Sequence, residues 1–154
     1  LKAWSTPSSR FDPAAAGDSW LAALPSPSVA AYYDFLDVED FYFVAGLEKS
    51  VDLAESLSLT VGATLGYGLK DYNRFYFDPG DPAPGDPALE RVDEDAFNDL
   101  NVSVELAWKV SEKVSLSLLG QYTSLIEDPV KTAAKEAYGD SEWFLGGAKV
   151  SWAF

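Results

Sequence analysis

An alternation of apolar and polar residues with a period of two constrains this chain more than any other feature of its sequence. From Ser56 to Gly68, apolar side chains at odd positions alternate with Ser, Thr and Gly at even positions. A helix would scatter the apolar residues around its circumference, whereas a β-strand collects them on one face. This segment is therefore predicted to be a strand with one apolar face and one small, polar face.

The same alternation recurs along the chain and predicts an all-β, antiparallel up-and-down sheet. The predicted strands cover about 29–35, 41–53, 56–68, 99–110, 114–123 and 143–154. A seventh strand could end at about 19–24, before the turn sequence Pro25-Ser26-Pro27. Residues 1–27 are accordingly predicted to be a loop and the end of a preceding strand. Residues 28–154 are predicted to be barrel strands, with an acidic outer loop over 70–98.

The second face of the strands distinguishes a soluble barrel from a membrane barrel. A soluble barrel needs an exterior rich in Lys and Glu, but the second face here is mostly Ser, Thr, Gly, Ala and Asn. Small polar residues suit a lumen, with the apolar face turned toward lipid. We therefore interpret the fold as a transmembrane β-barrel. The residues expected to line its pore are Glu48, Glu105, Gln121 and Lys149.

Aromatic residues and connection lengths agree with this interpretation, because membrane barrels place aromatics at both interfaces and have short periplasmic turns. With the chain end on the periplasmic side, the short connections near 52–56 and 110–114 are periplasmic. The long connections at about 69–98 and 125–142 then lie outside. Lys49 points outward by parity, and we expect it near the inner interface. The expected interface aromatics are Tyr67, Trp108, Tyr122, Phe144, Trp152 and Phe154.

The last residues, FLGGAKVSWAF, resemble the C-terminal signature of Gram-negative outer-membrane proteins. That signature has a final aromatic, here Phe154, preceded by apolar residues at alternate positions. More broadly, residues 27–154 resemble uncharacterised porin-like outer-membrane proteins, through segments such as SLSLTVGATLGYGLKDYN and KVSLSLLGQYTSLI. The resemblance implies a location in the cell outer membrane, contact with its lipid and lipopolysaccharide, and recognition by the barrel-assembly machinery.

The chain is expected to be the C-terminal part of a larger barrel. It contains no Met, and no signal peptide precedes the first strand. Barrels of this type usually have an even number of strands, so we expect further strands upstream of Leu1. A homo-oligomer is also compatible with such a protein.

Composition excludes several classes of function. Without Cys or His, the usual zinc, copper and haem ligand sets cannot be assembled, so no cofactor is expected. Outer-membrane lipases, palmitoyltransferases and proteases rely on a histidine that is missing here, and we expect no enzyme. A formal net charge of -14 repels phosphate backbones and argues against nucleic acid as a partner. No segment approaches the ~20 apolar residues of a transmembrane helix.

The acidic loop carries a second, weaker hypothesis. Its carboxylates could bind Ca²⁺ or bridge lipopolysaccharide through divalent ions, although their spacing matches no EF-hand, and a solvated loop is favoured. The candidate ligands are Asp78, Asp81, Asp93 and Asp95.

The function expected from these patterns is passive diffusion of small solutes through an outer-membrane pore with a weak cation preference. Two alternatives stay open: a structural or adhesive barrel with a filled interior, and a soluble, lipocalin-like ligand-binding barrel. Strand number separates the pore from the filled barrel, because eight strands leave room only for side chains.

Overall fold

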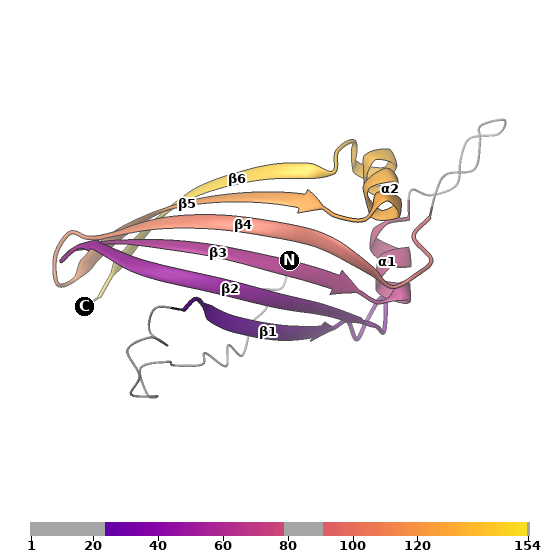
Figure 1. The fold of residues 1–154 in the computed structure, drawn as a ribbon, viewed down its shortest axis with the longest axis horizontal. Helices are drawn as coiled ribbons and strands as arrows, with labels where there is room; N and C mark the ends of the chain where they lie inside the picture. The colour runs from indigo at the N-terminus through magenta and orange to yellow at the C-terminus, as the bar shows by residue number, and fades with distance from the viewer. Residues whose placement is uncertain (1–23, 79–90, 154) are drawn as a thin grey trace.

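The chain forms one sheet of six antiparallel strands in up-and-down order, which confirms the predicted sheet (Figure 1). The computed structural model describes residues 24–78 and 91–153. The strands are β1 (Ser26–Tyr33), β2 (Phe41–Ala54), β3 (Leu57–Gly68), β4 (Ala96–Lys109), β5 (Val114–Leu125) and β6 (Glu142–Trp152). Over the described residues β1 and β6 pair only with β2 and β5, so these six strands form an open sheet and not a closed barrel.

Strand β1 lies earlier in the chain than predicted, at Ser26–Tyr33 instead of about 29–35. The strand begins at Ser26, and Pro27, which was expected in a turn, pairs with Leu47. Proline is tolerated here because an edge strand needs its hydrogen-bonding groups on one side only. Phe35 was expected in the strand but lies in the following turn, where the Asp34 carboxylate accepts the N–H group of Leu36 at 2.9 Å.

The two long connections were predicted as loops but contain helices, α1 (Lys70–Tyr76) and α2 (Asp128–Tyr138). The predicted loop 70–98 also ends early, because β4 begins at Ala96. Neither of the two described helices has the length and apolar character needed to cross a bilayer.

Two distant carboxylates stabilise the start of α1, which has only seven residues and would be marginal in isolation. Asp95 accepts the N–H group of Lys70 at 2.8 Å. Asp40, in the connection between β1 and β2, accepts the N–H groups of Asp71 and Tyr72 at 3.0 and 3.2 Å. These bonds satisfy N–H groups that have no partner inside the helix. Since neither carboxylate is adjacent to α1 in sequence, no local capping motif indicated the helix.

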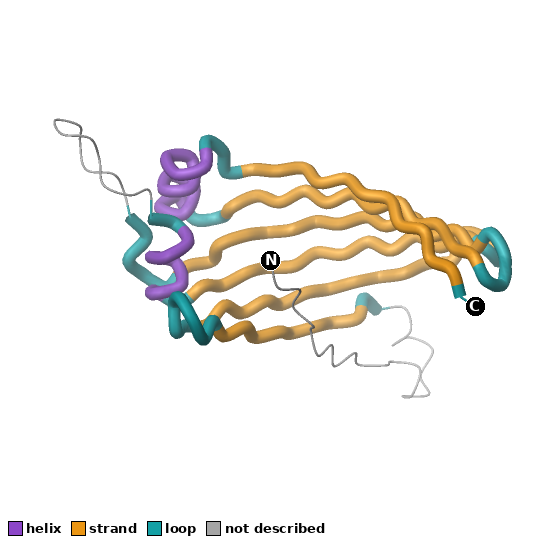
Figure 2. Tube along the Cα trace, turned by 180° about the vertical axis from the view of Figure 1, so that it is seen from behind, coloured by secondary structure: helices purple, strands orange, loops and turns teal. Residues whose placement is uncertain are grey.

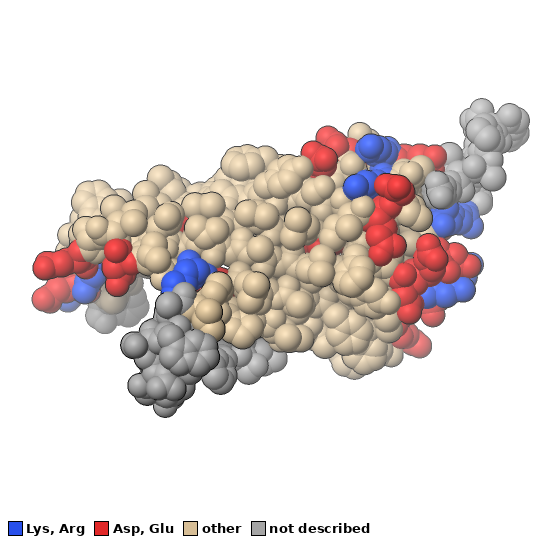
Figure 3. Space-filling view, viewed as in Figure 1, with Lys and Arg blue, Asp and Glu red and all other residues tan. Residues whose placement is uncertain are grey.

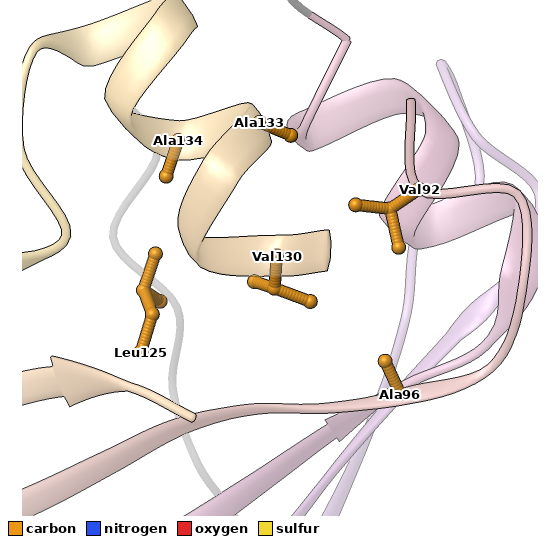
Figure 4. Close-up of a cluster of buried hydrophobic side chains, with 6 residues drawn as sticks. All are labelled: Val92, Ala96, Leu125, Val130, Ala133 and Ala134. Atoms are coloured by element: carbon orange, nitrogen blue, oxygen red, sulfur yellow. The ribbon is translucent and has the colours of Figure 1, made fainter. Parts of the chain in front are cut away.

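Helix α2 covers a small apolar core beside the end of the sheet. Its first turn contains Pro129, and it ends at Gly139, whose φ of 87° is left-handed, a conformation that glycine adopts readily. The buried side chains of the helix recur at the helical spacing i, i+3 and i+4 and pack against Val92, Ala96 and Leu125 (Figure 4). The helical members of the cluster are Val130, Ala133 and Ala134.

The connections divide by length between the two ends of the sheet (Figure 2). Both helices and the β1–β2 connection lie at one end, which we call the helical end. The short connections after β2 and β4 lie at the other, which we call the turn end. Such a division follows from antiparallel order, and the predicted grouping of short and long connections is correct.

The sheet is curved (Figure 2). On a curved sheet, side chains splay apart on the convex face and converge on the concave face. The odd-numbered residues of β3 and their cross-strand partners occupy the convex face. Val61 and Val104, which pair there, are each 44% exposed. Thr60 and Thr64 lie on the concave face and are half-buried. On the face drawn in Figure 3, most charged residues gather at the two ends, and the band between them is mostly uncharged.

Candidate functional site

The predicted pore-lining residues all lie on the concave face, but the register does not gather them into one cluster. Each pairs with a small residue on a neighbouring strand. The pairs are Glu48 with Gly62, Glu105 with Thr60, Gln121 with Ser103, and Lys149 with Ser117. They are spread over four strands, β2, β4, β5 and β6.

Gln121 belongs to a hydrogen-bonded group centred on Asn101, which we call the Asn101 network. The Asn101 amide nitrogen donates to Asp99 at 2.5 Å and to Thr64 at 3.2 Å. Its carbonyl oxygen accepts from Gln121 at 3.2 Å and from Thr123 at 2.6 Å. The side chain of Asn101 thus uses both donors and both acceptor positions. Of the residues in this network, only Gln121 was predicted to line the pore. The alternation places the other members on the same face but does not distinguish them from the remaining polar residues there.

A β-bulge in β4 adds an extra polar side chain to the concave face. Leu65 pairs with Leu100, but Tyr67 pairs with Phe97, so Gly66 faces two consecutive residues of β4. Those residues are Asn98 and Asp99, and both side chains reach the concave side of β3. A bulge often redirects a side chain toward a site.

Two glycines of β3 make room for these side chains. A Cβ at Gly66 would collide with the Tyr42 hydroxyl and the Asp99 carboxylate, which are hydrogen-bonded to each other. A Cβ at Gly68 would collide with the buried pair Asn73 and Asn98, whose side chains are joined by a 2.7 Å hydrogen bond. Glycine is therefore required at both positions by the close approach of a polar pair.

A cavity of about 470 Å³ opens beside this bulge, between β1, β2, β4 and α1. We call it the tyrosine cavity. Its tyrosine rings lie in series, with centroids 6.3 Å apart for Tyr32 and Tyr42, 4.8 Å for Tyr42 and Tyr72, and 4.5 Å for Tyr72 and Tyr76. Burial raises the pKa of the Tyr72 phenol, which stays neutral at physiological pH. The polar part of the lining is formed by Asp34, Asp99 and Asn101.

The predicted interface aromatics within the described residues lie on the convex face at its two ends. Tyr67 and the cross-strand pair Tyr122–Phe144 are near the helical end, and Trp108 and Trp152 are near the turn end. Phe154 lies outside the described residues. Further convex aromatics at the helical end were not predicted as interface residues. These are Tyr33, Phe41, Phe43 and Phe97. Alternation along β1 and β2 indicates three of them, whereas Phe97 lies on the convex face only because the bulge in β4 shifts the alternation by one residue.

The candidate calcium ligands are engaged elsewhere or lie outside the described residues, as Asp81 does. Asp78 forms an ion pair with Arg91 at 3.2 Å, and Asp93 forms one with Lys70 at 3.3 Å. Asp95 accepts a backbone N–H group of α1. Over residues 24–78 and 91–153, no three carboxylates are grouped closely enough to hold a metal ion.

Comparisons of the chain with protein-family models, with curated proteins and with solved structures find no match. The chemistry of the two faces of the sheet is therefore what indicates a function.

Proposed function

We propose that this chain forms part of the wall of an outer-membrane β-barrel through which small solutes diffuse passively. The convex face contacts lipid, and the concave face lines a water-filled interior with a weak cation preference. The observation that carries the proposal is the separation of side chains by face. Neighbours on β4 illustrate it: Val104 is exposed among apolar residues on the convex side, while Glu105 lies on the concave side beside Thr60.

The size of the apolar band fits a bilayer. Strands β2 to β6 have between 11 and 14 residues, enough for the roughly 9 to 11 of a tilted spanning strand. At about 3.3 Å per residue, Tyr67 lies about 33 Å from Leu57 along β3. A tilt of about 40° reduces this to about 25 Å, the usual height of the apolar band of such barrels.

The aromatic residues mark both borders of that band. Tyr67 and Phe97 pack at 5.0 Å near the helical end, and Trp108 and Trp152 lie near the turn end. Aromatic rings prefer the headgroup region, where an apolar ring and a polar group are both satisfied. A soluble barrel would expose this whole face to water, far beyond the apolar patches that soluble monomers tolerate. The proposal therefore places the lipocalin-like alternative last.

Lys49 is the one charged residue within the convex band of the described strands. It was expected near the inner interface, but it pairs with Val61, near the middle of β3. Its ammonium group donates to the carbonyl oxygen of Leu24 at 3.4 Å, and Leu24 precedes β1 on the side of the turn end. This bond gives the ammonium group a polar partner, while the methylene groups of the side chain can lie in the apolar layer.

The proposal requires further strands beside β1 and β6. Backbone N–H and C=O groups without partners cost several kcal/mol each in hydrocarbon, so a sheet in a bilayer must close on itself. Strands from elsewhere in the protein would pair with both edges. A total above eight would leave an open channel, whereas eight would leave a filled interior.

The test is fractionation followed by conductance of the full-length protein. We expect the protein in the outer-membrane fraction and soluble only with detergent. In planar bilayers it should conduct, with a reversal potential that indicates a preference for cations. Recovery of a monodisperse protein without detergent would refute membrane insertion. Insertion without conductance would support the filled barrel instead.

A further inference from the structure

We propose that the tyrosine cavity is a binding site for a small organic cation, such as a quaternary ammonium, alkylammonium or guanidinium compound. This binding site goes beyond passive diffusion, because it means that one place on the concave face recognises a solute. The site combines stacked aromatic rings, a carboxylate held in position by neighbouring side chains, and a cavity of suitable size.

The aromatic part of the site would contact the cation directly. The rings of Tyr42, Tyr72 and Tyr76 follow one another from β2 into α1 at centroid separations below 5 Å. Tyr42 and Tyr72 are stacked, so each covers one face of the other. A cation in the cavity would meet the ring faces that the stack leaves open, and it is attracted to them within about 6 Å of the ring centroid. The rings come from a strand and a helix, so their arrangement depends on α1, whose first turn is bound by Asp40 and Asp95.

The charged part of the site favours a positive ligand. Asp34 and Asp99 line the cavity, and among the described residues no Lys or Arg does. Asp99 is half-buried and is held by Tyr42 and by Asn101. Its position depends on the bulge opposite Gly66, so the carboxylate is built into the sheet and is not a mobile surface group. A partly buried charge is screened less by water and attracts a cation more strongly.

The size of the cavity separates small solutes from larger ones. About 470 Å³ lies within the range of about 300 to 1,000 Å³ that is typical of small-molecule sites. Neutral sugars also stack on tyrosine, and their hydroxyl groups can donate hydrogen bonds to the two carboxylates, but they carry no positive charge to pair with them. Anions are repelled by them. A compact cation with an apolar body uses both the rings and the charge.

The experiment compares choline with its neutral isostere 3,3-dimethylbutan-1-ol, which replaces the nitrogen with carbon. Binding to the full-length protein is measured by calorimetry in polyoxyethylene ether micelles, which contain neither ammonium groups nor sugars. We expect choline to bind at least about tenfold more tightly than the isostere, because the neutral isostere lacks both the cation–π attraction and the charge pairing. Equal affinity, no choline binding, or tighter binding of glucose would overturn the proposal.

Variants locate the binding. Asp99→Asn keeps the shape of the side chain and should weaken choline binding at least about fivefold, whereas Asp52→Asn removes the same charge at the turn end and should not. Tyr72→Ala should weaken binding similarly, and Tyr72→Phe, which keeps the ring, should not. Unchanged binding in Tyr72→Ala, or equal loss in Asp52→Asn, would overturn the site. Because no bilayer is involved, absence of a pore would leave this result intact.

Discussion

The hydroxyl group of Tyr42 on β2 donates a hydrogen bond to the carboxylate of Asp99 on β4, across the strand that lies between them. The two residues are 57 positions apart in the chain, and they meet because the intervening residue of β3 is Gly66. One glycine without a side chain therefore allows a polar pair to span three strands and to form one wall of the tyrosine cavity.

The first prediction concerns that glycine. Gly66→Ala should lower the free energy of unfolding by about 1 to 3 kcal/mol, because the new methyl group displaces Tyr42 or Asp99. Gly147→Ala is the matched control, since a Cβ there has no neighbour within 4 Å. Urea unfolding in micelles, monitored by tryptophan fluorescence, measures the free energy of unfolding of both variants. Adding Tyr42→Phe to Gly66→Ala should restore part of the loss; equal effects of the two alanine variants would contradict the steric account.

The second prediction tests which face meets lipid. Val104→Arg should impair insertion by about 2 to 4 kcal/mol, the cost of a cation near the middle of the lipid-facing surface. Glu105→Gln should leave folding unchanged and reduce cation preference, because Glu105 lies on the concave face. Folding yield in lipid vesicles and reversal potentials in planar bilayers provide the two readouts. Tolerance at position 104 with failure at position 105 would mean that the faces are reversed.

The third prediction concerns pH and the turn after β1. The backbone N–H groups of Asp37 and Leu36 hold the pKa of the Asp34 carboxyl below its usual range. A group with a lowered folded-state pKa stabilises the folded turn above the unfolded pKa of about 3.9, and this contribution is lost as pH falls through the folded value. Carbon-detected NMR titration should give a midpoint below about 3.9 for Asp34. In Asp34→Asn, the Leu36 and Asp37 amide shifts should lose this acid transition.

The fourth prediction concerns the outer edges of β1 and β6. If further strands close the barrel, the amides of β6 that point away from β5 should exchange with deuterium as slowly as those of the central strand β4. Exchange is measured on the full-length protein in micelles. Fast exchange at every second residue of β6, with slow exchange in β4, would show that this edge is open.

The strands could be predicted from the sequence because alternation is a local property. Between Leu57 and Gly68, successive side chains point to opposite faces of the strand, so the odd or even position of a residue decides its face. This holds whatever the rest of the chain does. The order of the strands and the grouping of short and long connections follow from the same pattern. The placement of Glu105 on one face and Val104 on the other was therefore predictable without knowledge of any contact.

Features that depend on distant partners could be decided only by the tertiary structure. Helix α1 is too short to be stable alone and takes its N-terminal hydrogen bonds from Asp40 and Asp95, which lie far from it in sequence. The bulge at Asn98 and Asp99 exists in relation to Gly66 on another strand, and it creates the charged wall of the tyrosine cavity. A residue pattern with a period of two specifies which face a side chain occupies, but which side chains meet on that face depends on cross-strand register, and register is set by the whole sheet.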